Sequence, residues 1–412
     1  MMDRRRLSLT LSRIIVQFVI LISLGSCVLM SASVLRESFD IAVLQAPVPV
    51  AIEDKHQLVY EVHLTNFSGD LLRLLTLRVV DGETHTQVLS LSGAVLAGRL
   101  HVVGLAVAGN QDISTSIAPG QRAIVYVEID CPHGQVPHLL EHEIEYLAGK
   151  DSTPLVVTGG RITIKNTAAT DLGPPVGGGI WVAVHDPDWT RGHRRVIYTL
   201  NGQARIPGRF AIDWIRVDEH GRTAKGDPDT VSNWYGYGAD VLAITDATVV
   251  AIRDHMAEKE RVSENQKQSI EDAPGNYVVL ELSDHRFAFY EHLKPGSIHV
   301  RVGDSVHRGQ AIGALGFTGE STGPHLHFHV ADGPTPLGAE GIPYAFEQFR
   351  LLGHYVDVEA MGSAKWQPLN PGLSASRTNE LPSSNAVLRF WPDGAVASQG
   401  GNRGHDNCDA HP

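Results

Sequence analysis

The sequence predicts a mainly β protein, in which an N-terminal β-sandwich-like domain precedes a second folded domain. Runs such as Leu58–Leu64 and Ala123–Ile129 alternate apolar residues with others, as strands with one buried face do. The 41 glycines and 22 prolines imply frequent turns, and long amphipathic helical patterns are hard to find after residue 40. Because 412 residues exceed what one hydrophobic core usually supports, we expect two folded domains with tails.

The first forty residues have the pattern of a targeting segment. Basic residues precede the apolar run Ile14–Leu24, and small residues follow it. The run Leu24–Cys27 also resembles a lipoprotein cleavage box, in which Cys27 becomes the lipidated first residue. An uncleaved membrane anchor is the alternative, because the apolar stretch continues through Val28–Met30. Each route exports the protein to the periplasm or cell envelope, and membrane contact is expected only through this segment.

The charge balance argues against nucleic acid as a partner. The chain has 34 Lys and Arg against 46 Asp and Glu, for a formal net charge of −12. No basic block outside the extreme N-terminus could bind a phosphate backbone. Of the 3 cysteines, only Cys131 and Cys408 follow the targeting segment, so no disulfide framework is implied.

Composition divides the chain further. Alternating runs extend from about residue 42 to 167, and the histidines scattered there lack a ligand spacing, so each is expected to be a surface or strand-face residue. Glycine and proline around Gly173–Gly179 favour a linker, and the polar composition after residue 362 favours disorder. The predicted segments are targeting at 1–40, β-sandwich-like at 41–167, linker at 168–179, second domain at 180–350 and disordered tail at 363–412.

Three histidines alternate within Ser321–Val330. On a β-strand His325, His327 and His329 would point to one face, while the apolar residues between them point into the core. Neutral imidazole is a good zinc ligand, and a catalytic zinc site needs three protein ligands and a position for water. An exposed strand face would show the same alternation, so the surrounding sequence decides the interpretation.

Several flanking segments form one ordered pattern. They are Gly238–Ala243, Gly275–Leu280, Tyr290–Leu293, Val302–Gly313 and Gly319–Phe328. In content and order they resemble the lysostaphin-type (LytM-like) zinc metallopeptidases. The resemblance implies a compact antiparallel β-sheet fold with a groove that holds zinc.

The resemblance also implies roles for single residues. His327, the second His of His-x-His, corresponds to a zinc ligand. His325 and His292 correspond to residues that contact the metal-bound water and the developing oxyanion, and they are the predicted catalytic residues; which does which stays open. Zinc lowers the pKa of its bound water toward about 7 and polarises the scissile carbonyl, while a nearby imidazole can move a proton.

One expected ligand is missing. The family's other ligands come from a His-x-x-x-Asp motif, and here Asp213 fits the Asp while Arg209 stands in place of the His. Arginine stays protonated and has no lone pair for a metal. His193 is the nearest upstream replacement, so the predicted metal ligands are Asp213, His327 and His193. His329 is another candidate, and a site without metal is a further alternative.

Two functions therefore compete. The first is a zinc-dependent metalloendopeptidase that cleaves peptidoglycan peptides outside the cytoplasm. The second is a catalytically inactive LytM-like protein that binds cell-wall peptides or activates a partner hydrolase. The sequence specifies neither the bond cleaved nor the oligomeric state.

Overall fold

The computed structural model describes residues 36–105, 114–132, 135–165, 170–186, 189 and 192–390. Most of the predicted targeting segment, Cys27 included, and the end of the predicted tail lie outside these residues. Within them no helix is long and apolar enough to cross a membrane, and Cys131 is buried and unpaired. The described residues from Ser38 onward belong to one compact unit.

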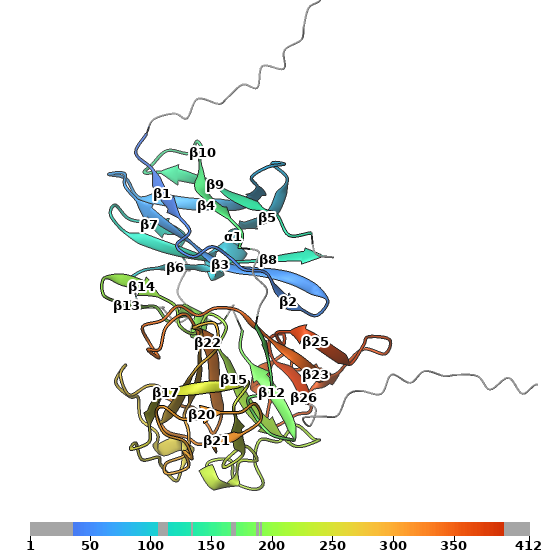
Figure 1. The fold of residues 1–412 in the computed structure, drawn as a ribbon. Coiled ribbons are helices and arrows are strands. Elements are labelled where there is room, and N and C mark those ends of the chain that lie inside the picture. Colours follow the sequence, from blue (N-terminus) through green and yellow to red (C-terminus); the bar gives the residue numbers. More distant parts are fainter. Residues whose placement is uncertain are drawn as a thin grey trace, which may run out of the picture. The chain divides into compact units, whose positions relative to one another are not determined.

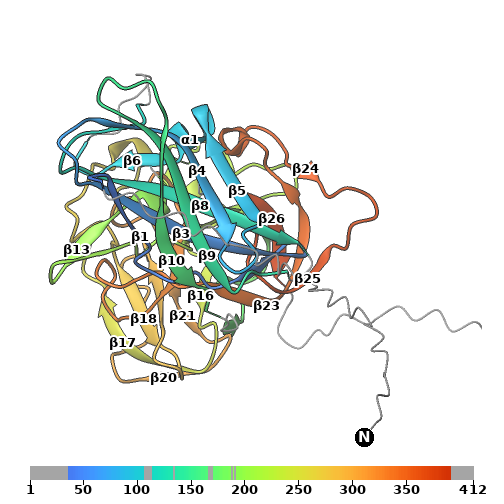
Figure 2. The ribbon, with the colours of Figure 1, turned by 90° about the horizontal axis from the view of Figure 1, so that it is seen from above.

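Two antiparallel sheets make up the first part of the chain (Figure 1). One contains β1 (Phe39–Ala42), β2 (Val50–Ile52), β3 (Lys55–Asn66), β6 (Leu100–Val102) and β8 (Arg122–Pro132). The other contains β4 (Leu72–Asp81), β5 (Gln87–Ser92), β7 (Ser116–Ile117), β9 (Leu139–Ala148) and β10 (Leu155–Thr163), and a short helix α1 (Gly93–Gly98) follows β5. Figure 2 shows β9, β4 and β5 side by side.

These two sheets share a hydrophobic core. Leu58 and Val125 of one sheet and Leu77 and Ile144 of the other are buried in the same cluster. The alternation read from the sequence explains this packing, because each strand turns its apolar residues to one face. The β-sandwich-like prediction is confirmed.

A larger, mainly antiparallel sheet forms the second part. Its strand order is β11 (Thr170–Leu172), β23 (Tyr344–His354), β26 (Ala386–Phe390), β12 (Ile180–Val184), β15 (Ile212–Val217), β22 (Leu326–Ala331), β19 (Phe287–Glu291), β18 (Tyr277–Glu281), β17 (Ala247–Arg253) and β20 (Ser305–Val306). Strands β24 (Gln367–Pro368) and β25 (Ser376–Glu380) pair with β23. Two short antiparallel pairs complete the described strands: the hairpin of β13 (Tyr198–Leu200) with β14 (Gln203–Arg205), and β16 (Asp240–Leu242) with β21 (Ala311–Ala314), which lie far apart in sequence.

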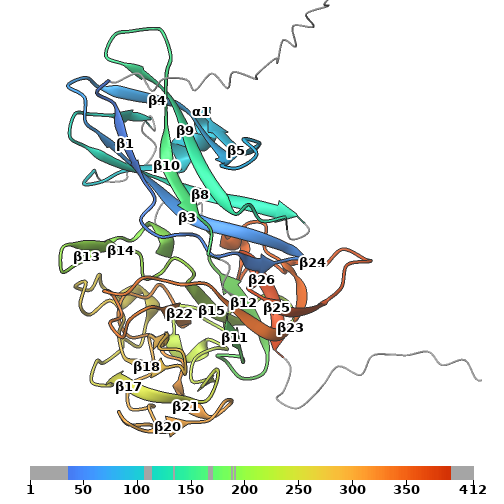
Figure 3. The same ribbon diagram turned by 45° about the horizontal axis from the view of Figure 1, so that its top comes forward.

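The predicted disordered tail is wrong for residues 363–390. Strand β26 lies between β23 and β12, and its Ala386, Val387 and Leu388 are fully buried (Figure 3). The apolar run in this strand is short and polar residues surround it, so the sequence pattern did not predict a strand there. The predicted linker also contains β11, and its Leu172 and Val176 are buried in the core of the large sheet.

The centre of the large sheet has apolar residues on both faces. Strand β12 is buried at every position: Trp181 and Ala183 join one cluster, and Ile180, Val182 and Val184 join another. On β22, in contrast, Leu326, Phe328 and Val330 enter the core while the histidines between them face the other way. The predicted alternation of this strand is confirmed, and it places imidazoles at the middle of the sheet.

Candidate metal centre

The strand register brings a carboxylate and an imidazole together. Asp213 of β15 lies directly opposite His327 of β22. On the other side of β22, Glu291 of β19 lies opposite His327 as well. His292 follows Glu291 at the end of β19, so three adjacent strands deliver these side chains to one place.

Asp213 is the hub of the cluster. Its Oδ1 accepts a hydrogen bond from His327 Nδ1 at 2.9 Å and lies 3.3 Å from His325 Nε2. Its Oδ2 lies 3.2 Å from Nε2 of His193. Burial opposes ionisation of Asp213, but His193 and then His325 lower the pKa of its carboxyl well below the usual range. The carboxylate is therefore charged and available as a ligand.

His193, Asp213 and His327 form a group with metal-ligand geometry. One possible ligand atom from each lies within 4.8 Å of the others, and no other such group occurs among the described residues. The rings of His193 and His327 are 4.6 Å apart, edge to face. Two imidazoles and a carboxylate are the donor set of many catalytic zinc sites, so these residues fit the metal that the sequence suggested.

His193 belongs to the short 3₁₀-helix η1 (His193–Arg195) rather than to a strand. Gly208 leaves room for it, because a Cβ at this glycine would lie 2.8 Å from His193 Cβ. His193, the upstream candidate from the sequence, therefore lies close enough to Asp213 and His327 to be the third ligand.

His292 and His325 flank this group with fixed ring orientations. His292 Nδ1 donates to the carbonyl of Thr318 at 2.8 Å, and His325 Nδ1 donates to the carbonyl of Gly323 at 2.7 Å. With Nδ1–H engaged, each ring keeps Nε2 for other partners. The two rings are 4.7 Å apart, and that of His292 is 5.9 Å from that of His327.

The surroundings of His292 and His325 shift the pKa values of the two imidazoles in opposite directions. Burial, and next the neighbouring His325 and His327, lower the pKa of His292 well below its usual range. Burial is the largest single effect on His325 and opposes its protonation, but the charge of Asp213 together with the hydrogen bonds to Asp213 and to the carbonyl of Gly323 raises the pKa of that ring. His292 additionally adopts a φ of 62°, an uncommon backbone conformation for a residue with a side chain, as is frequent at functional sites.

A cavity of about 320 Å³ opens over the cluster. Its lining includes all five residues singled out from the sequence, His193, Asp213, His292, His325 and His327. Ala273 and Pro274, from the segment that precedes β18, line it too. A groove over polar groups of perturbed pKa is the usual form of a binding or catalytic site.

Glu291 is a lining residue that the sequence reasoning missed. Burial, and next the charge of Asp213, raise the pKa of its carboxyl to about 8. Its Oε1 has no hydrogen-bond partner in the described structure. The only sequence signal was its place beside His292 in the run Tyr290–Leu293.

Two residues weighed from the sequence lie outside the ligand group. Arg209, in place of the family's histidine, donates to Oε2 of Glu61 at 3.0 and 2.8 Å. His329 stacks on Phe289 with ring centroids 4.5 Å apart, and its Nδ1 lies 3.2 Å from His327 Nε2. His329 therefore supports His327 instead of joining the group.

Comparison with known proteins finds a family match for part of the second domain. Residues 234–338 match peptidase family M23. This match confirms the family resemblance seen in the sequence for this part of the chain. The matched residues include His292, His325 and His327, while His193 and Asp213 precede them.

Among curated proteins, the relatives include two from Vibrio cholerae serotype O1. The peptidoglycan DD-endopeptidase ShyC is 34% identical over 133 residues, which cover 32% of this chain and 28% of ShyC. The peptidoglycan DD-endopeptidase ShyA is 43% identical over 65 residues, which cover 16% of this chain and 15% of ShyA. The chain thus matches less than a third of the length of each relative.

Among solved structures, the catalytic domain of lysostaphin from Staphylococcus simulans is 20% identical. The similarity covers 40% of this chain and 88% of that domain, with a TM-score of 0.22.

Proposed function

We propose that this protein is a zinc-dependent metalloendopeptidase that cleaves peptidoglycan peptides outside the cytoplasm. The observation that carries the proposal is the convergence of His193, Asp213 and His327 beneath a groove, with two further imidazoles beside them. Family M23 and the two DD-endopeptidase relatives support the reaction type and the substrate class.

Zinc bound to this group would supply a water of lowered pKa and would polarise the peptide carbonyl. The chain's own residues supply the proton transfers. Nε2 of His292 can accept a proton and return it to the leaving amine, because its Nδ1–H is held by the carbonyl of Thr318. Nε2 of His325 can equally donate a hydrogen bond to the oxygen that gains charge. Both rings are held by backbone carbonyls, so little reorientation is needed during the reaction.

The test combines metal content with cleavage. Wild type is expected to contain about one zinc per chain and to cleave purified peptidoglycan, whereas His193→Ala, Asp213→Ala and His327→Ala each lose most of the metal and the activity. His292→Ala should retain zinc and lose activity, because this residue is not in the ligand group. His220→Ala, at an exposed position outside the cavity, is the control.

The outcome distinguishes the two functions weighed from the sequence. A wild-type protein that carries no zinc at saturating metal and cleaves nothing would reject the enzyme. A groove that still binds peptidoglycan fragments under those conditions would establish the binding protein in its place.

Export is the second part of the proposal, and it rests on the pattern of the first forty residues. Fractionation of cells that express the full chain should place it in the envelope. Recovery of the chain in the cytoplasmic fraction would contradict this.

A further inference from the structure

His193 differs from the other two members of the ligand group in how the fold holds it. Asp213 and His327 belong to paired strands of the central sheet. His193 begins a three-residue 3₁₀-helix, in which the described backbone hydrogen bonds run from Arg195 N to the carbonyl of Gly192 and from Val196 N to the carbonyl of His193. Such a short element has little stability of its own. Its position must therefore come from tertiary contacts.

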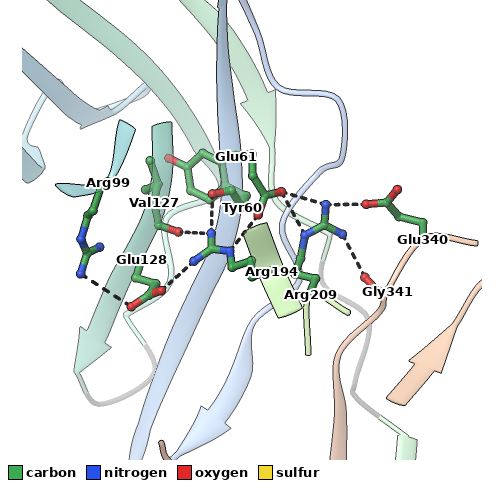
Figure 4. A network of polar contacts seen from close by, with 9 residues as sticks. All are labelled: Tyr60, Glu61, Arg99, Val127, Glu128, Arg194, Arg209, Glu340 and Gly341. Carbon is green, nitrogen blue, oxygen red and sulfur yellow. Dashed lines mark hydrogen bonds and ion pairs between the residues drawn. The ribbon is translucent and has the colours of Figure 1, made fainter. Parts of the chain in front are cut away.

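Those contacts are made by the next residue, Arg194. The guanidinium donates to Glu61 at 2.8 Å and to Glu128 at 2.6 Å (Figure 4). It also donates to the carbonyls of Tyr60 and Val127, at 2.7 and 2.9 Å. All four partners belong to β3 and β8 of the sandwich-like part, and the Arg194 side chain is only 4% exposed.

Arg195 also connects η1 to the sandwich-like part of the chain. Its guanidinium lies over the ring of Tyr126 at 4.0 Å, and it donates to the carbonyl of Gly98 at 3.1 Å. Both residues after His193 are thus anchored on the first part of the chain, while His193 itself reaches Asp213.

Glu61 connects this anchor to the residue that replaced the family's ligand. Its Oε1 accepts from Arg194 and its Oε2 from Arg209, and Arg209 also pairs with Glu340 and donates to the carbonyl of Gly341 at 3.0 Å (Figure 4). Buried charges of this kind are tolerated only when each has its partner, and removal of one partner leaves the other charge uncompensated. The contacts of Arg194 therefore fix the position of η1, while Arg209 and Glu340 complete the charge balance around Glu61.

We propose that Arg194 and Glu61 are positioning residues for metal binding, so that the sandwich-like part of the chain holds His193 in the ligand group. Metal ligands must be placed within a fraction of an ångström, and supporting contacts set that placement. The inference rests on the proposed function, because it takes His193 to bind zinc. It adds that zinc affinity depends on residues that touch neither metal nor substrate.

The test measures zinc affinity in the full chain by competition with a chromogenic chelator. Arg194→Lys keeps the charge but cannot reproduce the planar fork that reaches all four acceptors. We expect it to weaken zinc binding at least about 10-fold, the usual effect of losing a supporting contact. Glu340→Gln is the matched control, since Glu340 is equally buried in the network but contacts Arg209 and not Arg194. Its zinc affinity should stay within about threefold of wild type, below the range expected for a supporting contact.

A second measurement distinguishes misplacement of His193 from a general loss of stability. The visible spectrum of the Co²⁺-substituted Arg194→Lys variant should shift toward that of His193→Ala, because both lose the same ligand. Thermal unfolding with chelator present reports the stability of each metal-free variant. If Arg194→Lys yields no folded protein, Glu128→Gln decides, because it removes the negative charge of one partner of Arg194 and should weaken zinc binding in the same direction.

Unchanged zinc affinity in the folded Arg194 or Glu128 variant would overturn the inference while leaving the proposed function intact. An equal loss in Glu340→Gln would overturn it as well, since the effect would then be general. A wild type that binds no zinc would instead reject the proposed function, and this inference with it.

Discussion

Buried histidines in this chain serve two different ends, and their partners distinguish them. In the candidate site, imidazoles converge on the charged Asp213. His142 in the sandwich-like part is as deeply buried but has neutral partners: Nε2 meets the hydroxyl of Tyr60 at 2.9 Å, and Nδ1 meets the carbonyl of Gly160 at 3.0 Å. The sequence led us to expect a surface or strand-face residue there. Burial among neutral groups makes His142 a structural residue that must stay uncharged.

His142 should make the protein less stable in acid. Burial is the main cause that lowers its pKa from 6.5 to about 4. Between these values the unfolded chain binds a proton that the folded chain does not, so stability is full above pH 6.5 and falls as the pH drops toward 4. A fall from pH 7 to pH 4.5 should cost about 2 kcal/mol through this residue.

Denaturant unfolding of wild type and His142→Gln over this range measures the effect. The variant should be less stable at pH 7 but should lose less on acidification. His138→Gln, at a side chain that is 69% exposed, is the control. Equal pH dependence of His142→Gln and wild type would contradict the assignment.

Regular strand patterns were the elements that the sequence predicted best. In the His-x-His strand and in the long alternating runs, every second residue is apolar, and this pattern indicates which face of the strand is buried. The sequence therefore predicted strands β22, β3 and β8 correctly. Strand β26 did not, because five residues between polar stretches give too short a pattern to separate from a loop. The Glu61 network was beyond reach for another reason: its members lie far apart in sequence, and pairing of charges leaves no periodic trace.

The C-terminal strand should nevertheless contribute substantially to stability. Leu388 is fully buried and pairs with Trp181 of β12 and with Leu351 of β23. Leu388→Ala is expected to lower the free energy of unfolding by about 2–5 kcal/mol, as large-to-small changes in packed cores do. Arg389→Ala on the same strand removes only a partly exposed ion pair with Glu219 and should cost less than about 1 kcal/mol. If urea unfolding gave both variants the same free energy of unfolding, the prediction of a disordered tail would be supported again.

At the scale of the whole molecule, the first part has a core of its own, and several polar contacts join it to the second part. Two groups of these contacts include ion pairs between described residues. One is the Glu61 network. The other is the turn between β2 and β3, where Asp54 pairs with Arg377 at 2.7 Å and Glu53 contacts His354 at 2.6 Å. The two cores differ in which part of the chain supplies their residues. The main core of the first part contains only residues of that part, whereas the core of the second part also contains Val50 of β2.

This difference between the two cores predicts how the parts behave when they are separated. The fragment 38–165 should fold by itself, since every buried residue of its main cluster lies between Phe39 and Ile164. The fragment 170–390 should be less stable than the same region of the full chain, because Arg194 and Arg209 would lose Glu61. Far-UV circular dichroism and thermal unfolding of both fragments measure this. Adding the first fragment to the second should raise the unfolding midpoint of the second, and Glu61→Gln in the first should weaken that effect. A second fragment as stable alone as in the full chain would mean that the buried ion network contributes nothing to holding it.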